Sequence, residues 1–66
     1  MDKHNFRIEL RIAWLKDFFK TDKVSYDKNL RNPLVYYVEF NKARYEVTMD
    51  IDFFIIDKIY KITDLD

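Results

Sequence analysis

The sequence predicts a small α+β domain: a three-stranded, mostly antiparallel sheet with two short helices on one face, in the order strand, helix, loop, strand, strand, helix. Apolar residues alternate with polar ones over 6–12 and 34–51, and they recur with a helical period over 12–19 and 53–62. With only 66 residues, the whole chain, 1–66, is expected to form one domain. The alternative is a small all-β barrel in which the last segment is a strand.

The first strand is predicted from the strict alternation over residues 6–12. Its apolar side chains would lie on one face of the sheet. Arg7, Glu9 and Arg11 would lie on the other face. A short amphipathic helix over 12–19 would follow, because the apolar spacing changes there from two residues to three and four. Trp14 would lie at the boundary of its apolar face.

A long polar loop is predicted over residues 21–33. This stretch has no clear apolar period, and Asn32 before Pro33 disfavours a helix at the junction. Within the loop, residues 24–26 could form a brief edge strand. Loops of this length are often functional or mobile.

A hairpin is predicted over residues 34–51. Apolar residues alternate on both sides of an Asn-Lys dipeptide at 41–42, which fits a two-residue turn. The chain has no glycine, so a positive φ in this turn would fall to the asparagine. The register would place Glu39 opposite Arg44 and Tyr37 opposite Glu46, which gives the outer face an ion pair.

The second helix is predicted over residues 53–62. The apolar residues of this stretch cover about half of a helical wheel, and Asp52 could cap the N-terminus. Phe54 would fall on the polar side of this helix, apart from the core. The tail, 63–66, is expected to fray.

Several chemistries are excluded by composition. The chain has no cysteine, so it forms no disulfide and no thiolate metal site. Without glycine it cannot form a phosphate-binding loop or a dinucleotide-binding turn of the usual kind. Ser25 and His4 are the only residues that could form a nucleophile and base pair, and His4 lies near the terminus. We therefore expect no enzyme activity and no cofactor.

Three acidic residues are candidates for a metal site. Asp50, Asp52 and Asp57 could hold Mg²⁺ if a strand and the following helix brought them together. The simpler interpretation is that Asp50 faces solvent and Asp52 caps the helix. No metal is expected.

The compartment and source were inferred from composition. The N-terminus has no apolar segment typical of a signal peptide, and the longest apolar run spans only residues 53–56. We therefore expect a soluble cytoplasmic protein that does not associate with a membrane. The excess of Phe, Tyr, Ile, Asn and Lys reflects AT-rich coding, which fits low-GC bacteria and their phages.

The expected function is binding to a larger host protein, as an inhibitor or modulator plausibly encoded by a phage or mobile element. Aromatic and arginine side chains without a core role would carry it, because such residues anchor protein interfaces. The candidate partner-binding residues are Tyr37, Arg44, Phe54, Trp14 and Tyr26. Homodimerisation is the second expected association, because so small a core has neither disulfide nor thiolate metal to stabilise it.

The alternative function is a regulator that binds nucleic acid. Arg7, Arg11, Arg44 and Tyr37 would share one sheet face and could combine phosphate contacts with base stacking. The formal net charge of zero argues against this alternative. Residues 1–45 carry ten basic and six acidic side chains, and residues 46–66 carry two basic and six acidic ones. The second stretch could therefore form an acidic end able to steer a basic partner.

Overall fold

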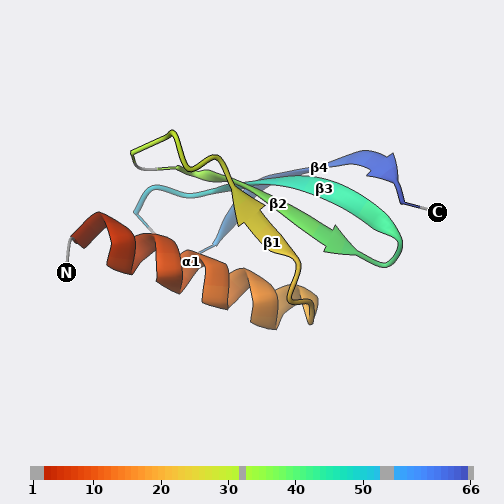
Figure 1. The fold of residues 1–66 in the computed structure, drawn as a ribbon, viewed down its shortest axis with the longest axis horizontal. Helices are drawn as coiled ribbons and strands as arrows, with labels where there is room; N and C mark the ends of the chain where they lie inside the picture. Colours follow the sequence, from red (N-terminus) through yellow and green to blue (C-terminus); the bar gives the residue numbers. More distant parts are fainter. Residues whose placement is uncertain (1–2, 32, 53–54, 66) are drawn as a thin grey trace.

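The computed structural model describes residues 3–31, 33–52 and 55–65. These residues form one helix, α1 (Lys3–Phe19), and four strands, β1 (Val24–Tyr26), β2 (Val35–Phe40), β3 (Ala43–Met49) and β4 (Ile56–Asp64). The strands form one antiparallel sheet in the order β1-β2-β3-β4, and α1 lies along one side of it (Figure 1). The predicted fold of three strands and two helices is therefore wrong.

The first error concerns residues 6–12, which belong to α1 and not to a strand. Ile8, Leu15 and Phe19 are buried on one face of the helix, a spacing of seven and four residues. Phe6 and Leu10 supplied the apparent alternation, but they are exposed. Because these two apolar side chains are exposed, the alternation that they create does not report a buried sheet face.

The end of α1 is closed by a residue in the left-handed conformation. Lys20 has a φ of 55°, and the N–H of Thr21 donates to the carbonyl of Lys16 at 3.1 Å. This is the bond that closes a Schellman motif, in which glycine usually occupies the left-handed position. In this chain, which has no glycine, lysine takes that position.

The predicted hairpin is confirmed in its turn and its register. Tyr37 lies opposite Glu46 and Glu39 lies opposite Arg44. The φ angles of the two turn residues at 41–42 are 51° and 60°, as a type I′ turn requires. The sequence argument assigned a positive φ only to the asparagine, whereas the lysine adopts one as well.

The turn predicts that Lys42→Gly stabilises the protein. A left-handed φ strains a residue that has a Cβ atom, and glycine removes this strain while adding chain entropy to the unfolded state. We expect a net gain of roughly 0.5–1 kcal/mol in the free energy of unfolding, measured by urea denaturation. The matched control is Lys16→Gly inside α1, which should lose about 1 kcal/mol. A loss at both positions would contradict the turn geometry.

The second error concerns the last segment, which is a strand and not the predicted helix over 53–62. In the β3–β4 ladder, Val47 lies opposite Ile59 and Met49 lies opposite Ile56. The step from Val47 to Met49 is two residues on β3, whereas the matching step from Ile59 to Ile56 is three residues on β4. A bulge shifts the register there. Residues three apart on β4 therefore share a face, and this spacing imitates the period of a helix.

The connection before β4 also differs from the prediction. Asp52 does not cap a helix: its N–H donates to the side chain of Asp50 at 2.8 Å, and the Asp50 N–H donates to the Ile55 carbonyl at 3.0 Å. Phe54 lies outside the described residues. Thr63 and Asp64, expected in a frayed tail, belong to β4.

The other edge of the sheet is formed by β1, inside the segment predicted as a long loop. Val24–Tyr26 pairs with β2 as the brief edge strand that the sequence allowed. β1 and β4 lie at opposite ends of the strand order, so the sheet is open. The barrel alternative is therefore wrong as well, although its last segment was correctly taken as a strand.

The core lies between α1 and the two central strands. Alternate residues of β2 and β3 point towards the helix, so the residues between them point to the opposite side of the sheet. No helix or strand of the described chain covers that side, which we call the open face. The buried apolar residues are Ile8, Leu15, Phe19, Tyr36, Val38, Ala43, Val47 and Met49.

One charged residue, Arg11, is part of this core. It lies between Ile8 and Leu15 on the buried side of α1 and is only 2% exposed, although the sequence had placed it on an outer sheet face. The Arg11 side chain hydrogen-bonds to Tyr36, whose hydroxyl donates to the Pro33 carbonyl at 2.9 Å. Burial raises the pKa of Tyr36 above its ordinary value of 10.0, and the hydrogen bond and positive charge of Arg11 partly oppose this shift.

Candidate functional site

The open face brings two of the predicted partner-binding residues together. Tyr37 of β2 and Arg44 of β3 are both half-buried. The guanidinium carbon of Arg44 lies 5.2 Å from the centre of the Tyr37 ring. A cation over a tyrosine ring at this distance contributes roughly 0.5–1 kcal/mol at an exposed site, and it holds both side chains in place. The pair therefore presents an ordered aromatic and cationic surface.

A shallow hollow of about 220 Å³ lies beside this pair. It is open to solvent along the β1 side of the face. Both signs of charge line it, so the hollow does not select for a strongly charged ligand. The lining residues are Asp22, Lys23, Val24, Ser25, Tyr37, Glu39 and Arg44.

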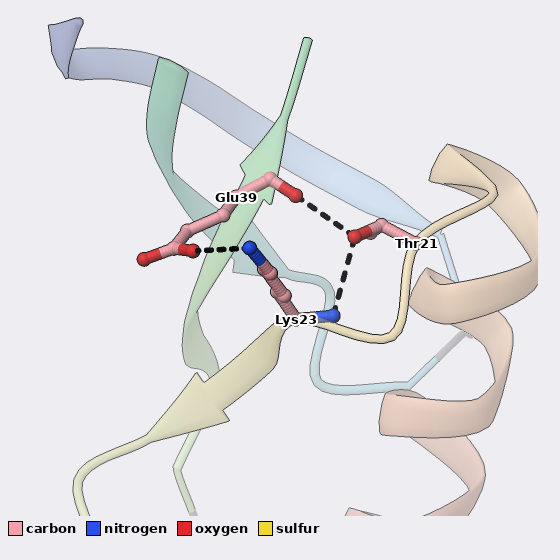
Figure 2. Close-up of polar contacts among 3 residues, drawn as sticks. All are labelled: Thr21, Lys23 and Glu39. Atoms are coloured by element: carbon pink, nitrogen blue, oxygen red, sulfur yellow. Dashed lines mark hydrogen bonds and ion pairs between the residues drawn. The ribbon is translucent and has the colours of Figure 1, made fainter. Parts of the chain in front are cut away.

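The rim of the hollow is held by three residues shown in Figure 2. The Thr21 hydroxyl donates to the Glu39 carbonyl at 2.9 Å and accepts from the Lys23 N–H at 3.2 Å. The Lys23 ammonium lies 3.8 Å from the Glu39 carboxylate. These contacts tie the segment after α1 to the end of β2. The ion pair formed by Glu39 is thus with Lys23, whereas the sequence had predicted one with Arg44.

A further aromatic residue of the open face was missed. Glu46 lies opposite Tyr37 on one side and opposite Tyr60 of β4 on the other, so the three side chains form one row across the face. Tyr60 is 58% exposed. In the helix predicted over 53–62 it would lie on the apolar side. Its signal was the β-branched and aromatic composition of 55–62, which favours a strand.

The remaining predicted residues do not join this surface. Tyr26 packs against the buried Tyr36 with ring centres 5.9 Å apart, so it lies on the helix side of the sheet. Trp14 is part of α1 and stacks on Phe18 with ring centres 5.0 Å apart. Phe54 lies outside the described residues. The five candidates therefore do not form one patch in the described structure.

The basic face expected for nucleic-acid binding does not form. Arg7 and Arg11 belong to α1, which covers the opposite side of the sheet, and Arg11 is buried. Of the three arginines predicted for this basic face, only Arg44 lies on the open face. Glu39 and Glu46 lie on the same face. The predicted basic face required residues 6–12 to form a strand of the sheet. Because these residues form a helix, that face is absent from the described structure.

The residues considered for chemistry are separated as well. Ser25 is exposed in β1, whereas the side chain of His4 lies outside the described part of the chain. Asp50 and Asp52 lie in the connection before β4, and Asp57 lies in β4. Among the residues with described positions, no three His, Cys, Asp or Glu side chains are grouped as a metal site would require. In the same part of the chain, no helix is long and apolar enough to cross a membrane.

Comparisons with known proteins place the chain in no family. No family model matches it, and neither a curated protein nor a solved structure matches it. Any proposal about its function therefore depends on the surfaces described above.

Proposed function

We propose that this protein is a small binding module that acts by occupying a surface of a larger protein, as an inhibitor or modulator. The contact surface in this proposal is the open face, with Tyr37, Arg44 and Tyr60 as its anchors. The observation that carries the proposal is the contact of Arg44 with Tyr37 on a sheet face that no described helix or strand covers.

The composition of the face supports a protein partner. Tyrosine and arginine are enriched at the centres of protein interfaces, because they bury a large area with few rotatable bonds. The ring of Tyr37 is already ordered by Arg44, so less entropy would be lost on binding than for a free side chain. An exposed Tyr60 at the other end of the row widens the contact area.

The charges of the face indicate which partner it would fit. The exposed Lys23 and Lys58 and the half-buried Arg44 lie on the same face as Glu39 and Glu46, so positive and negative groups alternate over a short distance. A polyphosphate chain would be repelled by the two glutamates, whereas a protein surface can match both signs. The proposal therefore favours a folded protein of mixed charge.

The experiment compares capture by the wild type and by Tyr37→Ala/Arg44→Ala. Both proteins, carrying a tag, are incubated with nuclease-treated lysate of the native host, and the captured proteins are identified by mass spectrometry. The affinity of each purified partner is then measured by calorimetry. We expect the double variant to weaken binding at least about tenfold, because truncation of an interface anchor costs 1–2 kcal/mol or more.

Arg31→Ala is the control, since Arg31 is an exposed arginine outside the strands. It should bind the partner as the wild type does, and circular dichroism should show that all variants are folded. Equal affinity of the wild type and the double variant would refute the open face as the contact surface. Capture from an untreated lysate that is lost after nuclease treatment would instead indicate a nucleic-acid ligand.

A further inference from the structure

The two edge strands of the sheet differ in length and in how closely other elements pack against them. β1 has three residues and packs near α1, whereas β4 has nine residues and pairs only with β3 among the described strands. Figure 1 shows β4 along the side of the sheet remote from β1. The outer backbone groups of a long edge strand can pair with a further strand.

Three large apolar or aromatic side chains of β4 are exposed, next to four charged ones. Ile59 is 46% exposed and Tyr60 is 58% exposed. Ile59 lies opposite the buried Val47, on the helix side, whereas Tyr60 lies opposite Glu46 on the open face. Ile62 is exposed as well. Edge strands of monomeric proteins usually avoid exposing several large apolar side chains.

We propose that β4 is a dimerisation edge, which pairs antiparallel with β4 of a second copy of this chain about a two-fold axis at Ile59. The two sheets would join into one sheet of eight strands, with the two copies of α1 on the same face. This inference goes beyond the proposed function and does not use Tyr37 or Arg44. It commits to a second copy because the charges of β4 complement each other when the strand is reversed.

The charge pattern supports this register. With Ile59 opposite its own copy, Asp57 lies opposite Lys61 and Ile56 lies opposite Ile62, each pair occurring twice. A slip by one residue in one direction places Lys58 opposite Lys61. Larger slips in the same direction place Ile59 against Lys61, or Lys61 against its own copy. The register at Ile59 therefore combines opposite charges with apolar pairs.

An existing contact of β4 is compatible with this arrangement. The Lys61 ammonium lies 2.6 Å from the Asp64 carboxylate, and this ion pair raises the pKa of Lys61 above its ordinary value of 10.5. Both side chains are largely exposed, so the pair is weak and open to a second carboxylate. In the dimer, Asp57 of the second copy would approach the same ammonium.

The test is the mass in solution of the full chain, measured by analytical ultracentrifugation over a range of concentrations. The wild type should approach twice its chain mass of 8.2 kDa as concentration rises. Ile59→Lys should weaken the dimer about 100-fold, because it places two like charges on the axis and removes the central apolar pair. The matched control is Leu30→Lys, an exposed leucine outside the sheet, which should dimerise as the wild type does.

A charge exchange tests the register without relying on Ile59. Asp57→Lys should weaken the dimer, and adding Lys61→Asp should restore it, because the two exchanged charges again face each other. A wild type that stays monomeric, an Ile59→Lys dimer of unchanged affinity, or a failure of the exchange to restore pairing would each overturn the proposal. Tyr37→Ala/Arg44→Ala should still dimerise, so a failure of the proposed function remains distinguishable from a failure of this inference.

Discussion

Leu15→Ala is expected to lower the free energy of unfolding by about 2–5 kcal/mol. Leu15 is completely buried at the centre of the contact between α1 and the sheet. The substitution removes buried apolar area and leaves a cavity, whereas alanine keeps the helix propensity of the segment. A domain of this length has a total stability of roughly 3–10 kcal/mol, so the loss is a large part of it. Urea denaturation followed by circular dichroism measures the change.

The control for this variant is its neighbour in α1. Lys16→Ala changes an exposed side chain of the same helix turn and should alter the free energy of unfolding by less than about 0.5 kcal/mol. If Leu15→Ala were as stable as Lys16→Ala, α1 would not be packed against the sheet by this residue, and the two-layer fold described above would be wrong.

The sequence contains the signal for α1, but a second signal obscured it. Ile8, Ile12, Leu15 and Phe19 recur at intervals of four, three and four residues, which is typical of a helix face. The exposed Phe6 and Leu10 created a competing alternation. Arg11 strengthened this alternation in the sequence, because a charged residue is normally assigned to the surface, whereas Arg11 is buried. Only the packing of the sheet decides between the two patterns.

The strand β4 could not be distinguished from a helix by its spacing. Its bulges place Ile56 and Ile59 on the same face, three residues apart. The hairpin of β2 and β3 has no such irregularity, so its register, its turn and the placement of Tyr37 and Arg44 on one sheet face followed from the sequence, whereas the contact between these two side chains did not. Tyr60 was missed as a member of the open face because its strand was missed. The candidate site was therefore predictable only where regular pairing links its residues.

The second large loss in the free energy of unfolding is expected on substitution of the buried Arg11. Arg11→Ala should lose about 2–5 kcal/mol, because it opens a cavity beneath α1 and removes a hydrogen bond from the buried Tyr36 hydroxyl. Arg11→Met should stay within about 1 kcal/mol of the wild type, because methionine fills a similar space and no charge has to be desolvated. The comparison separates packing by the arginine stem from the contribution of its charge. Equal losses in both variants would show that the charge and its hydrogen bonds dominate.

The titration of Tyr36 gives an independent measure of the same contact. Burial raises the pKa of Tyr36 in the folded protein above its ordinary value of 10.0. The stability that the protonated Tyr36 hydroxyl contributes is therefore complete below pH 10, and it is lost as the pH rises through the folded-state pKa. Arg11→Met removes the hydrogen bond and the positive charge that favour the phenolate, so the pKa should rise further. In a titration of tyrosinate absorbance, one of the five tyrosines should then ionise later than in the wild type. Tyr36→Phe should abolish that late step. An unchanged titration in Arg11→Met would mean that the guanidinium does not act on this hydroxyl.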